Sequence, residues 1–246
     1  MTDGPEPEVR STAGGHVTDE LSEPATLEWA GRSWMLLPDG SAYRADRRTL
    51  FVADLHLGKG SVFRARGIPV PRGGSADDLA RLSRTLQATG AERLVVLGDF
   101  LHARESLSPH VLQALEDWRR AHAGLEVTLV RGNHDLHAGD PPPELGVRVV
   151  EEGHAWDGLS LRHVPPDPPT QEAGGAGVAV AGHLHPVVRL EAFGGGRHRR
   201  RCFWVRADAL VLPAYARFAG GHAIRPRRGH RIFVPVDDGV VEVEAR

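Results

Sequence analysis

Residues 125–135 read LEVTLVRGNHD, and this stretch decides the fold class. The apolar run from Leu125 to Val130 predicts a buried β-strand. The strand runs directly into Gly132-Asn133-His134-Asp135, so an amide, an imidazole and a carboxylate follow its end. Open α/β sheets gather their functional groups at the ends of strands. The stretch therefore predicts an α/β (α+β) protein with a polar site at one edge of a sheet.

Four further polar segments repeat this arrangement along the chain. Each follows a run that predicts a strand: Asp54-Leu55-His56 after Leu50–Ala53, Gly98-Asp99 after Arg93–Leu97, His163 after Leu159–Arg162, and Gly182-His183-Leu184-His185 after Val178–Ala181. Alternate side chains of an extended chain share a face, so Asp54 and His56 should point the same way, as should His183 and His185. Together the segments supply two carboxylates, one amide and four or five imidazoles, a donor set that suits two divalent cations.

No single segment is specific. A second Asp-x-His occurs at Asp135-Leu136-His137, and a lone histidine such as His163 is more often a structural residue. The alternative interpretation is that these histidines satisfy unrelated hydrogen bonds, but an ordered series of five segments is hard to explain in that way. His102 and His137 lie close to the segments in sequence, where we expect at most supporting roles.

Two helices and a β-rich second half are expected around these segments. One helix begins near Ser75, where Ser75 and Asp78 predict a capping box, and another begins at Ser108-Pro109. Residues 26–37 predict a hairpin that turns at Gly31-Arg32, and further short strands are expected at residues 147–150, 187–190, 202–206, 210–212, 232–236 and 240–243. Residues 1–24 predict a disordered acidic tail, residues 25–246 a single domain, and residues 165–177 a long Pro/Gly loop.

Composition narrows the setting. Cys202 is the only cysteine among 246 residues, which excludes an intramolecular disulfide and a thiolate metal site and favours a reducing compartment. The N-terminus lacks a signal-peptide core, and no segment approaches the roughly 20 apolar residues of a membrane span. We therefore expect a cytoplasmic protein without a membrane partner.

The charge is unevenly distributed. The net charge is −2, yet residues 189–231 contain eleven arginines against Glu191 and Asp208. Such a segment suits phosphate-bearing partners, although a solvated basic face is an equal alternative. Lys59 is the only lysine beside 29 arginines, and its compact ammonium suits a phosphate oxygen.

The ordered segments resemble the calcineurin-like metallophosphoesterase superfamily, whose pattern is D-x-H, G-D, G-N-H-[DE], H and G-H-x-H. The resemblance implies a two-sheet β-sandwich flanked by helices and a two-metal site. It places Asp54, His56 and His185 on the first metal, Asn133, His163 and His183 on the second, and Asp99 between them. It also implies that a bridging hydroxide attacks phosphorus, while His134 assists the leaving oxygen and Asp135 orients His134.

Sequence between these motifs is similar to the bacterial ligase-associated phosphodiesterase family called PdeM. The similar segments are Leu55–Gly60, Phe63-Arg64, Arg66–Pro71, Leu97–His102, Gly182–Pro186 and Cys202–Trp204. This resemblance implies a manganese-dependent phosphodiesterase linked to a DNA ligase, an exonuclease and a helicase in DNA repair. Lys59, Arg64 and Arg66 are then candidate contacts to a substrate phosphate.

Three alternatives remain open at this point. The donor set also suits iron or zinc. The same site could belong to a phosphomonoesterase or a cyclic-nucleotide phosphodiesterase. A non-catalytic interaction module on a decayed scaffold is the third, but decay should remove ligands that are all present here.

Overall fold

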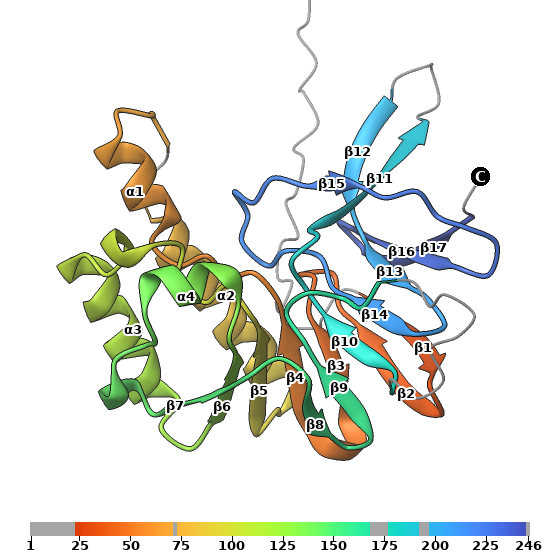
Figure 1. Ribbon diagram of the computed structural model, residues 1–246, viewed down its shortest axis with the longest axis horizontal. Helices are drawn as coiled ribbons and strands as arrows, with labels where there is room; N and C mark the ends of the chain where they lie inside the picture. Colours follow the sequence, from red (N-terminus) through yellow and green to blue (C-terminus); the bar gives the residue numbers. More distant parts are fainter. Residues whose placement is uncertain (1–22, 71–72, 168–176, 192–196, 245–246) are drawn as a thin grey trace, which may run out of the picture.

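The computed structural model describes residues 23–70, 73–167, 177–191 and 197–244. Two large sheets face each other, and helices cover the outer face of one of them (Figure 1). Residues 1–22 of the predicted tail and residues 168–176 of the predicted 165–177 loop lie outside the described residues. The end of that tail differs from the prediction, because Glu23 forms a bridge to Gly239 and its carbonyl accepts the Val240 N–H.

The first sheet runs in sequence order, β1-β2-β3-β4-β5-β6-β7. Its strands are β1 (Ala25–Trp29), β2 (Arg32–Leu36), β3 (Ala42–Arg44), β4 (Thr49–Val52), β5 (Arg93–Leu97), β6 (Glu126–Val130) and β7 (Val147–Val150). The first four pair antiparallel, and β4 to β7 pair parallel. The parallel half requires crossover connections, and α2 (Gly74–Thr89) and α3 (Pro109–Ala121) provide those from β4 to β5 and from β5 to β6.

The second sheet has the order β17-β16-β13-β14-β10-β9-β8. Its strands are β8 (His154–Trp156), β9 (Leu159–Leu161), β10 (Ala179–Ala181), β13 (Phe203–Val205), β14 (Ala209–Val211), β16 (Arg231–Val236) and β17 (Gly239–Val243). A small third sheet joins β11 (Pro186–Glu191), β12 (Arg197–Arg201) and β15 (His222–Ala223). It follows directly from the last polar segment, and the β11–β12 hairpin projects from the body of the protein (Figure 1).

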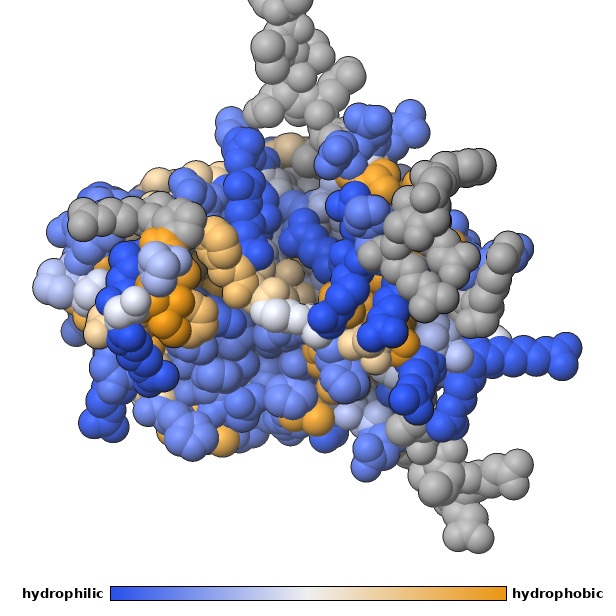
Figure 2. Space-filling view, turned by 90° about the horizontal axis from the view of Figure 1, so that it is seen from above, coloured by the Kyte–Doolittle hydropathy of each residue, from blue (hydrophilic) through white to orange (hydrophobic). Residues whose placement is uncertain are grey.

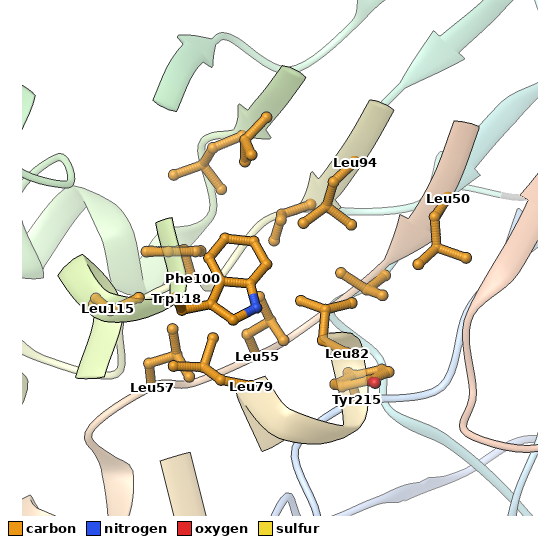
Figure 3. Close-up of a cluster of buried hydrophobic side chains, with 14 of the residues drawn as sticks. Leu50, Leu55, Leu57, Leu79, Leu82, Leu94, Phe100, Leu115, Trp118 and Tyr215 are labelled. Carbon is orange, nitrogen blue, oxygen red and sulfur yellow. The ribbon is translucent and has the colours of Figure 1, made fainter. Parts of the chain in front are cut away.

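Two apolar layers hold these elements together. Between the sheets, Trp34 and Phe51 pack with ring centroids 5.3 Å apart, and Phe203 and Phe233 meet them from the second sheet. On the other face of the first sheet, leucines of α2 pack with Trp118 of α3 (Figure 3). The predicted two-sheet sandwich flanked by helices is therefore confirmed.

Several local predictions were wrong. Helix α2 begins at Gly74, and Ser75 does not cap it, because the Ser75 hydroxyl instead accepts the Gly58 N–H. Asp78 pairs with Arg81 one turn along the same helix. The β1–β2 turn lies at Ala30-Gly31, one residue earlier than expected, since both residues have positive φ.

Two short helices next to the polar segments were not expected. They are α1 (Lys59–Ala65) and α4 (Asn133–Ala138). Single 3₁₀ turns occur at η1 (Ala45–Arg47), η2 (Arg104–Ser106) and η3 (Pro143–Leu145). In the described part of the chain, no helix has the length and apolar character to cross a membrane.

Phe51 offers a test of the layer between the sheets. The residue is fully buried, and its ring also meets Trp156 with centroids 5.1 Å apart. Phe51→Ala should lower the free energy of unfolding by about 3–5 kcal/mol in urea denaturation. The control Val241→Ala, on exposed β17, should change it by less than about 0.5 kcal/mol. Equal effects of the two substitutions would contradict this view of the core.

Candidate metal centre

The polar segments meet where the strand ends of the two sheets are joined by backbone hydrogen bonds, from the Tyr215 and Ala216 N–H groups, which follow β14, to the Ala53 and Asp54 carbonyls. Just beyond β4 and β5, the Asp54 N–H donates to the Gly98 carbonyl and the His56 N–H to the Asp99 carbonyl. In the second sheet, the Gly182 N–H donates to the His163 carbonyl. These bonds fix the relative positions of the segments before any side-chain contact is considered.

The backbone at the candidate ligands is not extended. Eight described non-glycine residues have positive φ, and five of them are candidate ligands: Asp54, His56, Asp99, His183 and His185. The expectation that strand alternation aligns Asp54 with His56 was therefore wrong in mechanism. Left-handed turns aim these side chains, and such conformations cost roughly 1–3 kcal/mol each and concentrate at functional sites.

Two glycines allow the segments to approach this closely. A Cβ at Gly98, where φ is +80°, would lie 2.0 Å from His163 Nδ1. A Cβ at Gly182 would lie 2.6 Å from the Ala53 Cβ and 2.8 Å from Asp54 Oδ2. The glycines of the G-D and G-H-x-H segments are thus steric requirements of the centre.

Asp54, His56 and His185 form a first cluster. Their candidate ligand atoms all lie within 4.8 Å of one another. His185 Nε2 lies 3.2 Å from Asp54 Oδ1 and 3.4 Å from His56 Nε2. The three residues implied for the first metal are therefore brought together.

Asn133, His163 and His183 form a second cluster. His163 Nε2 lies 2.8 Å from Asn133 Oδ1 and 3.0 Å from His183 Nδ1. His163 is fully buried, and its other ring nitrogen lies 3.0 Å from the Leu97 carbonyl oxygen. The lone histidine without a local motif is thus held as firmly as the others.

Asp99 reaches both clusters. Its Oδ1 lies 3.4 Å from His163 Nε2, and its Oδ2 lies 3.7 Å from His56 Nε2. The same Oδ1 accepts the backbone N–H of His134. One buried carboxylate therefore faces both sets of candidate ligands, as a bridging ligand would.

The donor set fits divalent cations. Asp54 Oδ1 is buried without a hydrogen-bond partner among the described residues. If His163 Nδ1 donates to the Leu97 carbonyl, His163 Nε2 presents a lone pair to the amide oxygen of Asn133. The same holds at His185, whose Nδ1 lies 3.0 Å from the Gly220 carbonyl oxygen. Lone pairs that face one another at these distances require positive charge between them.

The pKa shifts of the clustered histidines and of Asp99 also fit a cation-binding site. Burial, followed by Lys59 and neighbouring histidines, lowers the pKa of His56 to about 2, which keeps its imidazole in the neutral form that binds metals. Burial lowers the pKa of His185, but Asp54 and the Gly220 carbonyl outweigh it and raise the pKa overall. Burial and Asp54 raise the pKa of Asp99. The buried Asp99 carboxylate thus attracts a proton or a cation.

His134 lies beside the clusters and is about one-third exposed. Its Nε2 is 4.0 Å from Asp99 Oδ2, and its Nδ1 is 2.6 Å from the carbonyl oxygen of His102. The expectation that Asp135 orients the His134 ring needs correction. The Asp135 carboxylate instead accepts the Gly132 and Leu101 N–H groups, and so fixes the loop that carries His134. The ring is oriented by a backbone carbonyl.

His102 was underestimated from the sequence. Its ring stacks on that of His134 with centroids 4.9 Å apart, and its Nδ1 lies 3.4 Å from His56 Nδ1. His56, His102 and His134 form a third group whose nitrogens approach within 4.8 Å. The position of His102 three residues after Asp99 was the only feature of the sequence that indicated a role for it. His137 hydrogen-bonds to the Asn133 carbonyl within its own helix.

The three basic candidates differ in position. Lys59 opens α1, and burial lowers its pKa, an effect that Asp54 and Asp99 partly oppose. Arg66 is close enough to His102 to lower the pKa of that histidine, after burial and nearer charges. Arg64 instead donates to Ser61 Oγ and lines a small hollow with His110 and Val111. Lys59, at the start of α1, is the basic candidate whose charge is coupled to both Asp54 and Asp99.

Comparisons with known proteins place the chain in a class. Residues 47–160 match the family model described as calcineurin-like phosphoesterase. The chain is similar to a Pseudomonas putida nuclease, MPE, at 36% identity and a TM-score of 0.75, over 90% of this chain and 100% of that one. The chain therefore belongs to the calcineurin-like phosphoesterase family, whose members depend on two metals, and it is a metal-dependent phosphoesterase.

Two other comparisons add little. The phosphoesterase Yfce from E. coli is 17% identical with a TM-score of 0.38, over 80% of this chain and 99% of that one. No curated protein sequence matches this one.

Gly182 tests the close approach of the two sheets. Gly182→Ala should destabilise the protein by about 1–3 kcal/mol, because the new methyl group overpacks against Ala53 and Asp54. It should also lower the metal bound per chain, measured by plasma mass spectrometry after dialysis. The control Gly124→Ala meets no atom within 4 Å and should bind metal as the unsubstituted chain does. Full metal content in the Gly182 variant would refute the steric argument.

Proposed function

We propose that this protein is a manganese-dependent phosphodiesterase that cleaves nucleic acid or a nucleotide-like diester. The observation that carries the proposal is the position of Asp99, whose two oxygens face two separate clusters of nitrogen and oxygen donors. The resemblance to the PdeM family and the likeness to a nuclease support a diester substrate.

Charge favours an anionic substrate at this centre. Asp54 and Asp99 are the two carboxylates of the proposed ligand set, and Asn133 contributes a neutral amide. Two divalent cations would bring four positive charges against these two negative ones. A net positive centre attracts a phosphate group, and the half-buried Lys59 adds to this attraction.

The proposed ligands are Asp54, His56 and His185 for one cation and Asn133, His163 and His183 for the other, with Asp99 shared. When bound, such a pair of cations supplies Lewis-acid stabilisation of phosphoryl oxygens and lowers the pKa of coordinated water. Oxygen and imidazole donors suit manganese as well as iron or zinc, and manganese rests on the family resemblance. The buried Cys202 thiol, with its pKa raised to about 12 by burial, stands outside all three groups.

His134 is proposed as the proton donor to the leaving oxygen. If Nδ1 donates to the His102 carbonyl, a protonated ring still has its Nε2–H free for a substrate. That nitrogen belongs to a partly exposed side chain next to Asp99, so it can meet a bound diester from the solvent side. Positioned proton donors typically contribute about 10²–10⁴-fold to a rate.

His134→Ala should lower kcat on an oligonucleotide by about 10²–10⁴-fold with an unchanged metal content. The loss should be much smaller on bis(4-nitrophenyl) phosphate, because nitrophenolate leaves without a proton. The control His154→Ala, on β8, should behave as the unsubstituted chain on both substrates. Equal losses on the two diesters would contradict proton donation, and undiminished hydrolysis of both would contradict any catalytic part for His134.

The rival functions share the centre and differ in substrate. With added Mn²⁺, the protein should hydrolyse single-stranded DNA and simple diesters faster than a phosphomonoester or a cyclic nucleotide. Turnover of the monoester alone would identify a phosphomonoesterase instead. A protein that binds no metal under these conditions would revive the interaction-module alternative.

The cellular setting is a further part of the proposal. A cytoplasmic role in DNA repair, beside a ligase, an exonuclease and a helicase, is supported by the PdeM resemblance. The substrate panel tests the enzymatic part of this setting, because a repair enzyme must accept DNA.

A further inference from the structure

A basic hollow opens directly beside the first cluster. Its volume is about 680 Å³, and His185 and Gly220 lie in its wall. Gly220 is also the residue whose carbonyl oxygen lies 3.0 Å from His185 Nδ1. The hollow therefore begins at a proposed metal ligand.

Arginines dominate the charge of this hollow. Arg81 and Arg84 come from α2, Arg201 from the end of β12, and Arg217 from the loop after β14. A second hollow of about 330 Å³ shares Pro38, Arg201, Val236 and Asp237 with the first and adds Arg199 and Arg200. We call the two hollows together the arginine trough. Six arginines line it against two carboxylates, Asp39 and Asp237.

The carboxylate of Asp39 is already occupied. It accepts hydrogen bonds from the hydroxyl groups of Ser41, Thr85 and Tyr215. Asp237 is exposed at the rim. The hydrogen-bonding capacity of Asp39 is therefore largely used by neutral hydroxyl groups, and the six arginines outnumber the two carboxylates of the trough.

The arginines fall into two groups by their contacts. Arg81 is about nine-tenths buried, pairs with Asp78, and lies 4.1 Å from the ring centroid of Tyr215. Arg199 donates to the Gly221 carbonyl and Arg201 to the Pro38 carbonyl, and burial followed by repulsion from Arg81 lowers the pKa of Arg201. By contrast, Arg84, Arg200 and Arg217 have no side-chain hydrogen bond or ion pair within the described ranges. The trough thus combines arginines held in place by contacts within the protein with three arginines whose side chains can reach a ligand.

We propose that the arginine trough holds the sugar–phosphate backbone of a nucleic-acid strand on one side of the scissile phosphate. The proposal rests on the proposed function. A single phosphate would leave most of the trough and of its charge unused, whereas a strand places successive phosphates along it. Figure 2 views the face on which α1 and the β11–β12 hairpin project and shows strongly hydrophilic side chains gathered over much of it.

The test compares a long substrate with a short one. Single-stranded DNA that extends past the centre can reach the trough, whereas bis(4-nitrophenyl) phosphate cannot fill it. In the variant Arg84→Ala/Arg200→Ala/Arg217→Ala, the ratio of kcat/KM for DNA to kcat/KM for the small diester should fall about tenfold or more. The salt dependence of DNA binding should weaken, with the slope of log K against log salt reduced by about 2 for three lost contacts.

A matched control removes the same charge elsewhere. The variant Arg93→Ala/Arg120→Ala/Arg148→Ala alters the start of β5, the end of α3 and the edge strand β7. Its ratio and salt slope should stay close to those of the unsubstituted chain. If the two triple variants behave alike, or if the trough variant loses equally on both substrates, the proposal is overturned.

Failure of the proposed function is a separate outcome. If the unsubstituted protein with Mn²⁺ hydrolyses neither diester, that function fails, and fluorescence anisotropy with labelled single-stranded DNA still tests the trough. Binding that is equal in both triple variants then overturns the trough as well. Hydrolysis of the small diester without any DNA binding would leave a phosphodiesterase and refute the trough.

Discussion

The two sheets meet at backbone distance where Gly182 lies against Ala53 and Asp54, and the rest of the centre depends on this contact. Because no side chain separates the strand ends there, donors from β4, β5 and β10 converge within a few ångströms. The apolar layer between the sheets holds them at this spacing. A larger residue at Gly182 would push apart the segments that supply Asp54 and His183, and the His183 N–H would lose its bond to Asp54 Oδ2.

The same crowding creates an electrostatic problem in the metal-free protein. Asp54 and Asp99 are both nearly inaccessible to solvent, and burial together with the charge of Asp54 raises the pKa of Asp99. Surrounding imidazoles can offset only part of this rise, since burial keeps His56 neutral. Binding of divalent cations would remove the conflict, so metal affinity and fold stability are coupled in this architecture.

The family resemblance implied the two-sheet sandwich, and the polar segments could be found because apolar runs that end in polar residues are visible in the sequence alone. The predictions from the sequence were wrong about the backbone conformation and some contacts of these polar segments. Strand alternation was a poor guide at His56 and His185, where the backbone turns left-handed, and no local pattern marked that turn. Ser75 looked like a helix cap because Gly58, its actual partner, is distant in sequence. The part of His102 depends on a carbonyl group and a stacked ring, neither of which a side-chain motif encodes.

The left-handed backbone at five proposed ligands also limits which residues can replace them. Aspartate, asparagine and histidine are the non-glycine residues that most readily adopt this conformation, and the first and last are the types found here. Glutamate could match the charge of Asp54 or Asp99, and cysteine could offer a softer donor at His56 or His185, yet neither shares this backbone tolerance. Few residue types can therefore be substituted at these positions to change the metal preference of the protein. The left-handed main chain sets this limit before coordination chemistry is considered.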